Sequence, residues 1–147
     1  MQKGFTFLEI LVVLLIIGML LAITSASYSQ VRSRSLDQRR KTDLEEVRAA
    51  LEQYRSVNSA YPTPYTTPGL AFGSEGLNDA THTYMQVLPQ DPQYPRYNYH
   101  YAVADDDYTL SSQLAVPEET ACQAPPGGDS CGTGIGCNYC IGSYGTK

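Results

Sequence analysis

This chain of 147 residues is long enough for one small globular domain in addition to an apolar amino-terminal segment. Its net charge is −5, and Arg96 and Lys147 are the only basic residues after Ser59. This acidic part of the chain argues against a nucleic-acid partner, and its many tyrosines favour a wet, partly exposed surface.

Residues 5–28 predict a helix that crosses a membrane. The run Ile10–Ile23 contains no charged or strongly polar side chain, and together with the residues from Phe5 onward it is long enough to span the hydrocarbon layer. Glu9 lies at the head of this run, where an ionised carboxylate is costly unless a positive charge meets it. The sequence therefore predicts a counter-charge for Glu9.

Residues 29–58 predict the amphipathic half of the same helix. No proline interrupts the chain, and apolar residues recur every three or four positions at Leu44, Val47, Leu51 and Tyr54. Asn58, followed by Pro62, predicts the end of the helix. A basic stretch within this half is expected to face solvent, lipid headgroups or acids of a neighbouring subunit: Arg32, Arg34, Arg39, Arg40 and Lys41.

Residues 59–117 predict a globular head that begins with an irregular loop. A short helix is expected from Asn78 or Asp79 to Leu88. Alternating residues in 97–103 and 108–116 then predict an antiparallel hairpin whose apolar face the long helix covers, which makes the fold class α+β. The turn Asp105–Asp107 lacks the ligand spacing of a calcium loop, so no metal is predicted there.

Residues 118–147 form a tail that contains all the cysteines of the chain: Cys122, Cys131, Cys137 and Cys140. Their even number among glycines and prolines predicts two disulfides in an oxidising, extracytoplasmic compartment, with three pairings open. The alternative is a membrane-anchored zinc or redox module built on the Cys-x-x-Cys pair. A c-type haem is excluded, because Ile141 rather than histidine follows the second cysteine of that pair.

The amino end allows three interpretations. A secretory signal peptide is compatible with Lys3 and with the small residues 25–27, but Glu9 interrupts its apolar start. A plain uncleaved anchor leaves Glu9 without a counter-charge. The stretch from Lys3 to Glu9 (KGFTFLE) also resembles the processing signal of type IV prepilins and type II secretion pseudopilins.

That resemblance implies that residues 1–4 are a leader. A membrane prepilin peptidase would cut between Gly4 and Phe5 and methylate the new amine of Phe5. The cationic amine of a neighbouring subunit, shifted along a filament axis, would then reach Glu9 and set the register of assembly.

The resemblance extends over residues 3–62 and, with less specific motifs, over residues 84–116. It implies a structural filament subunit rather than an enzyme, without a cofactor. The expected partners are other copies of the chain, the prepilin peptidase and methyltransferase, an inner-membrane assembly platform and membrane lipid. A minor tip pilin for adhesion or DNA uptake is the alternative within the same family.

The resemblance also implies the topology. The chain would cross the cytoplasmic membrane once, with its amino end on the inner side and its carboxyl-terminal domain outside, and assembly would yield a surface or periplasmic filament. The basic residues that follow the apolar run favour the opposite orientation by the positive-inside rule.

His82 and His100 have no nucleophile or carboxylate at a spacing typical of a catalytic site.

Overall fold

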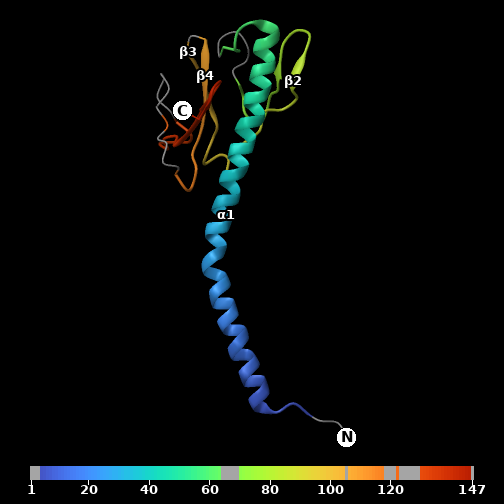
Figure 1. The fold of residues 1–147 in the computed structure, drawn as a ribbon, viewed down its shortest axis with the longest axis vertical. Coiled ribbons are helices and arrows are strands. Elements are labelled where there is room, and N and C mark those ends of the chain that lie inside the picture. The colour runs from blue at the N-terminus through green and yellow to red at the C-terminus, as the bar shows by residue number, and fades with distance from the viewer. Residues whose placement is uncertain (1–3, 64–69, 105, 118–121, 123–129, 147) are drawn as a thin grey trace. The chain divides into compact units, whose positions relative to one another are not determined.

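The computed structural model describes residues 4–63, 70–104, 106–117, 122 and 130–146, without the side chains of residues 23–27. The chain divides into two compact units, Met1–Ser35 and Leu36–Lys147. The second unit includes the predicted head of residues 59–117, and from here on we call this whole unit the head. Helix α1 (Phe7–Asn58) contributes to both units and contains 52 residues (Figure 1). The predicted long helix is confirmed, and it begins two residues later than expected.

The head contains a four-stranded antiparallel sheet in the order β3-β4-β5-β6. Strands β3 (His100–Ala104) and β4 (Asp107–Ser112) form the predicted hairpin, in which Tyr101 pairs with Leu110. The first strand is shorter than predicted, because the backbone N–H of Tyr94 donates to the carbonyl of Asp91, and those of Arg96 and Tyr97 donate to the carbonyl of Gln93, so this segment forms turns instead. The α+β class is confirmed.

Strands β5 (Tyr139–Gly142) and β6 (Gly145–Thr146) complete the sheet, and sequence analysis did not predict either of them. Strand β5 pairs antiparallel with β4, so that Ser111 lies opposite Cys140. The cysteine-containing tail therefore supplies part of the sheet.

The short helix expected after Asn78 is wrong. Instead β1 (Leu77–Asn78) and β2 (Thr83–Met85) pair as a small antiparallel hairpin. The carboxylate of Asp79 accepts hydrogen bonds from the backbone N–H groups of Thr81 and His82, each at 2.7 Å. This side chain closes a turn between two strands rather than capping a helix.

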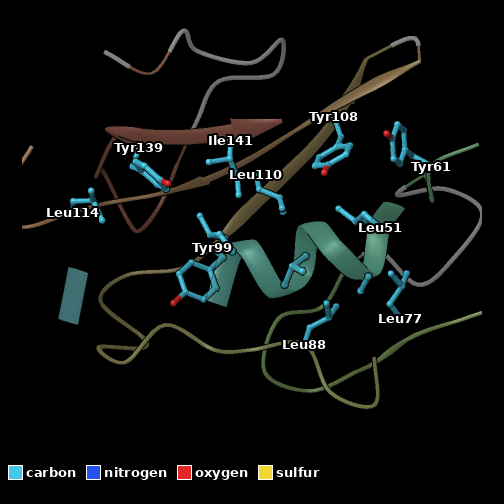
Figure 2. Packing of buried hydrophobic residues seen from close by; sticks show 13 residues of the cluster. Leu51, Tyr61, Leu77, Leu88, Tyr99, Tyr108, Leu110, Leu114, Tyr139 and Ile141 are labelled. Atoms are coloured by element: carbon cyan, nitrogen blue, oxygen red, sulfur yellow. The ribbon is translucent and has the colours of Figure 1, made fainter. Parts of the chain in front are cut away.

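The core of the head lies between helix α1 and the elements on its two sides. Figure 2 shows Leu110 and Ile141 of the sheet facing the helix from one side, and Leu77 and Leu88 facing it from the other. Of the predicted stripe, Leu44, Val47 and Leu51 are buried and Tyr54 packs against the core partly buried, while Ala50 is an additional buried residue of the helix.

Among the described residues, no helix is both long enough and apolar enough to cross a membrane. The membrane crossing predicted for residues 5–28 is therefore not confirmed.

Candidate functional site

The amino end of α1 is closed by a reciprocal pair, Thr6 and Glu9. The carboxylate Oε2 of Glu9 accepts from the backbone N–H and from the hydroxyl of Thr6, both at 2.9 Å, and the N–H of Glu9 donates to Thr6 Oγ1 at 3.3 Å. This arrangement is a capping box, which satisfies backbone donors that the first turn of a helix leaves free. Sequence analysis singled out Glu9 and missed Thr6, although the Thr-x-x-Glu spacing is the signature of such a cap.

Both donors to Glu9 are uncharged groups. Within the described residues, Glu9 forms no ion pair, so the counter-charge that its position predicts is not supplied there. Gly4 and Phe5, the predicted cleavage positions, are both exposed.

The first unit presents an apolar surface on all sides of its helix. Fourteen large apolar side chains between Phe5 and Leu21 are 46–85% exposed, and no single stripe among them is buried. A helix that is apolar around its whole circumference is normally surrounded by other apolar groups. The described part of the first unit does not provide these surrounding apolar groups, because no apolar side chain of residues 5–21 is buried.

Arg40, expected on a solvated face, is instead the largest fully buried side chain of the head, with 1% exposure. Its Nε donates to Asp91 Oδ2 at 2.8 Å, its Nη1 donates to Asp37 Oδ1 at 2.9 Å, and its Nη2 donates to Gln93 Oε1 at 2.9 Å. Burial by itself lowers the pKa of the guanidinium, but the hydrogen bonds and charges of the two carboxylates outweigh burial and raise it. The earlier expectation is wrong for Arg40, because two acids accompany it into the interior.

The carboxylate of Asp37 also joins the helix to the segment after β4. Its Oδ1 accepts from the N–H of Ala115 at 2.9 Å, and its Oδ2 accepts from the N–H of Val116 at 3.0 Å. We call Asp37, Arg40, Asp91 and Gln93 the arginine cluster. It connects three separate segments of the head through charged hydrogen bonds.

The other members of the basic stretch lie nearer the surface. Arg32, Arg34 and Arg39 are exposed, as predicted. Lys41 is half-buried, with its Nζ 5.3 Å from the centre of the Tyr139 ring, which is a cation–π contact.

Tyr99, Tyr101 and Tyr108, which we call the tyrosine cluster, belong to the core or pack against it rather than forming an outer binding platform. The hydroxyl of Tyr99 donates to Asp43 at 2.7 Å, that of Tyr101 donates to the carbonyl of Pro62 at 2.9 Å, and that of Tyr108 donates to Glu52 at 3.1 Å. Burial, more than any other cause, raises the pKa of all three hydroxyls.

Two residues of the acidic turn, Asp106 and Asp107, contact other parts of the head, and Asp105 lies outside the described residues. Asp106 pairs with Arg55 at 2.6 Å, and Asp107 Oδ1 accepts from the hydroxyl of Ser143 at 2.7 Å. Within the described part of the chain, no group of histidine, cysteine or carboxylate side chains is arranged to hold a metal.

The four cysteines form two disulfides, Cys122–Cys140 and Cys131–Cys137, and none of them is free. The disulfides expected from the sequence are therefore present, and the pairing left open is resolved. The zinc alternative is wrong, because a sulfur bonded to another sulfur has no thiolate to offer a metal.

Two known families match the sequence. Residues 1–25 match the prokaryotic N-terminal methylation motif, and residues 28–118 match the family described as type II secretion system protein G. The type II secretion system core protein G of Klebsiella michiganensis is 31% identical over 116 residues, which cover 79% of this chain and 75% of that protein. The protein of the same description from Vibrio cholerae is 33% identical over 104 residues, covering 67% and 70%. No solved structure matches the chain.

Proposed function

Because the chain belongs to the type II secretion system protein G family, we propose that it is a structural subunit of a secretion pseudopilus and not an enzyme. The observation that carries this proposal is the apolar surface of residues 5–21, which is exposed on all sides in the isolated subunit. Packing the same segment of many copies together buries that surface without any other partner.

Processing at the amino end is the first step of the proposed function. Cleavage between Gly4 and Phe5 by a prepilin peptidase leaves a cationic amine on Phe5, and methylation of that amine keeps its charge. The match of residues 1–25 to the methylation motif supports this step, as does the exposure of both residues.

Assembly uses this amine as the counter-charge of Glu9. Among the described residues, the capping box gives the carboxylate two neutral donors, which hold its position and add no positive charge. When the segment is surrounded by apolar side chains, an uncompensated charge is costly, so subunits dock in the register that brings an amine to each Glu9.

Before assembly, membrane lipid takes the place of the neighbouring subunits. Residues 5–28 would lie in the cytoplasmic membrane, with the amino end inside and the head outside, where an assembly platform extracts the subunit. The two disulfides support the outer location of the head, because such bonds persist in oxidising compartments.

Glu9→Ala, with Glu9→Gln as the isosteric form, tests the proposed role. Glu46→Ala is the matched control, since it removes an exposed carboxylate from the same helix outside the apolar segment. Each full-length variant is expressed with the secretion machinery, its amino terminus is read by mass spectrometry, its membrane fraction is extracted with alkaline carbonate, and its filaments are imaged.

We expect all three variants to be cleaved after Gly4 and to resist carbonate extraction, and only the Glu9 variants to lose filaments. Normal filaments built from Glu9→Ala would overturn the role of Glu9 in register. An uncut amino terminus in the unsubstituted chain would overturn the proposed processing.

A further inference from the structure

The two disulfides of the head are nested. The loop closed by Cys131–Cys137 lies inside the loop closed by Cys122–Cys140, so no bridge involves both of the first two cysteines or both of the last two. Joining the first two cysteines to each other and the last two to each other would therefore give only wrong bonds, Cys122–Cys131 and Cys137–Cys140, whereas the native inner bridge joins the second and third cysteines.

The unfolded chain favours those two wrong bonds. Cys122 is nine residues from Cys131 and 18 residues from its native partner Cys140. The probability of loop closure falls roughly as the −3/2 power of loop length, so Cys122 meets Cys131 about threefold more often than Cys140. Cys137 in turn is three residues from Cys140 and six residues from its native partner Cys131.

The native pairs depend on the folded sheet. Cys140 lies in β5 between the core residues Tyr139 and Ile141 and is 2% exposed. Cys131 is 0% exposed, and its backbone is held by hydrogen bonds to Ile135 and Asn98. Each native bridge thus has one buried sulfur. Because exchange requires access of a thiolate to sulfur, wrong bonds must be corrected before β5 docks.

We propose that this chain reaches its native disulfides by thiol–disulfide exchange from the wrong pairs Cys122–Cys131 and Cys137–Cys140, and that an extracytoplasmic disulfide isomerase is its partner in that step. Recognition would be chemical: the isomerase supplies a reactive thiolate, and the unfolded cysteine segment presents two exposed, wrongly paired bonds.

The exchange balances without net oxidation. The isomerase thiolate attacks Cys140 in the Cys137–Cys140 bond, which forms a mixed disulfide and releases the Cys137 thiolate. Cys137 attacks Cys131 in the Cys122–Cys131 bond, which forms the native inner bridge and releases the Cys122 thiolate. Cys122 then attacks Cys140 in the mixed disulfide, which forms the native outer bridge and regenerates the isomerase thiolate. A separate oxidant that removes two electrons per bond makes the two wrong pairs beforehand.

The test is oxidative refolding of the full-length chain in detergent. The chain is reduced in urea, diluted, and oxidised with diamide, which removes two electrons per bond and releases no thiol. Pairings are then mapped by peptide mass spectrometry, before and after reduced glutathione is added. We expect fewer than about one third of the molecules, the share for random choice among three pairings, to be native at first. We expect at least a threefold rise in that share with glutathione and a faster rise with purified isomerase. Native pairs in most molecules without any thiol would overturn the proposal.

Two double variants are the matched controls. Cys131→Ser with Cys137→Ser leaves only the outer pair, and Cys122→Ser with Cys140→Ser leaves only the inner pair, so neither can mispair. We expect each to be fully oxidised by diamide alone, with no change when glutathione is added. If these variants need thiol as much as the unsubstituted chain does, mispairing is not the cause and the proposal fails. The disulfide map is read without filaments, so its outcome is independent of the proposed assembly.

Discussion

Replacement of Arg40 by methionine is expected to destabilise the head by about 3–5 kcal/mol, the cost of removing one partner from a buried ion pair. Methionine has a similar length and fills much of the same space, so loss of packing contributes little. The loss arises because Asp91 Oδ2 and Asp37 Oδ1 each lose a charged donor within 2.9 Å. Since small domains are stable by about 5–15 kcal/mol, the change is a large part of the total.

The pH dependence of this variant separates charge from packing. A buried carboxylate without its cation binds a proton more readily than the same group in the unfolded chain, so the folded state gains stability as the pH falls. The loss caused by Arg40→Met should therefore be smaller at about pH 5 than at about pH 8. A packing defect would cost the same at both values.

The assay is urea unfolding of the full-length chain in mild detergent, followed by tyrosine circular dichroism. Arg39→Met is the matched control, because the neighbouring arginine is exposed on the same helix and its loss should change stability by less than about 0.5 kcal/mol. A loss below about 1 kcal/mol for Arg40→Met, or equal losses at the two pH values, would refute the reasoning.

Three further outcomes are expected. Thr6→Val removes the capping hydroxyl and should speed amide exchange in the first turn of α1 about fivefold, whereas Thr6→Ser should leave it unchanged. Above about pH 10 the hydroxyls of the tyrosine cluster lose their protons in the unfolded chain but keep them in the folded head, where their pKa is raised. The free energy of unfolding in urea should therefore fall by about 1.4 kcal/mol per pH unit for each of these tyrosines above that pH, and stay level just below it. Asn138→Ala removes the side chain that accepts from the N–H of Leu114 at 2.6 Å and donates to its carbonyl at 2.9 Å. In the same urea assay this variant should lose about 1–3 kcal/mol of stability, whereas the control Asn78→Ala, at an exposed position, should lose almost none.

The helix and the central hairpin could be predicted because each has its own periodic pattern. The stripe through Leu44 and Leu51 repeats over several turns, and the alternation on both sides of the acidic turn extends over several residues. Such patterns report local geometry directly, and the structure differs from them only at the ends.

Strand β5 was missed because the strand it pairs with, β4, lies far away in the chain. Strand β5 contributes only two inward-facing residues, Tyr139 and Ile141, which is too short an alternation to recognise. It is a strand because β4 pairs with it and because a disulfide ties Cys140 to Cys122. The β1–β2 hairpin was mistaken for a short helix, because an aspartate such as Asp79 can cap a helix or close a turn equally well.

Arg40 did leave a signal in the sequence. Positions 37, 40, 44 and 47 continue the core stripe at spacings of three and four, so the charged pair Asp37 and Arg40 lies on the buried face of the helix. The core stripe was predicted from apolar residues alone, and the basic residues next to Arg40 in the sequence indicated a solvent-exposed face of the helix. Spacing, rather than residue type, was the better guide to burial here.

Glu9 and Arg40 are both charged residues of helix α1, but Glu9 is exposed in the first turn whereas Arg40 is buried in the core of the head. Arg40 finds two carboxylates in its own chain, and its removal should therefore weaken the isolated subunit. In the described part of the chain, Glu9 accepts only from the neutral groups of Thr6, so its replacement should leave the head as stable as before and act only when subunits meet. Urea unfolding of Glu9→Ala beside Arg40→Met measures this contrast. Equal destabilisation of the head by both variants would mean that Glu9 acts within the subunit, and the argument for a counter-charge from a neighbour would fail.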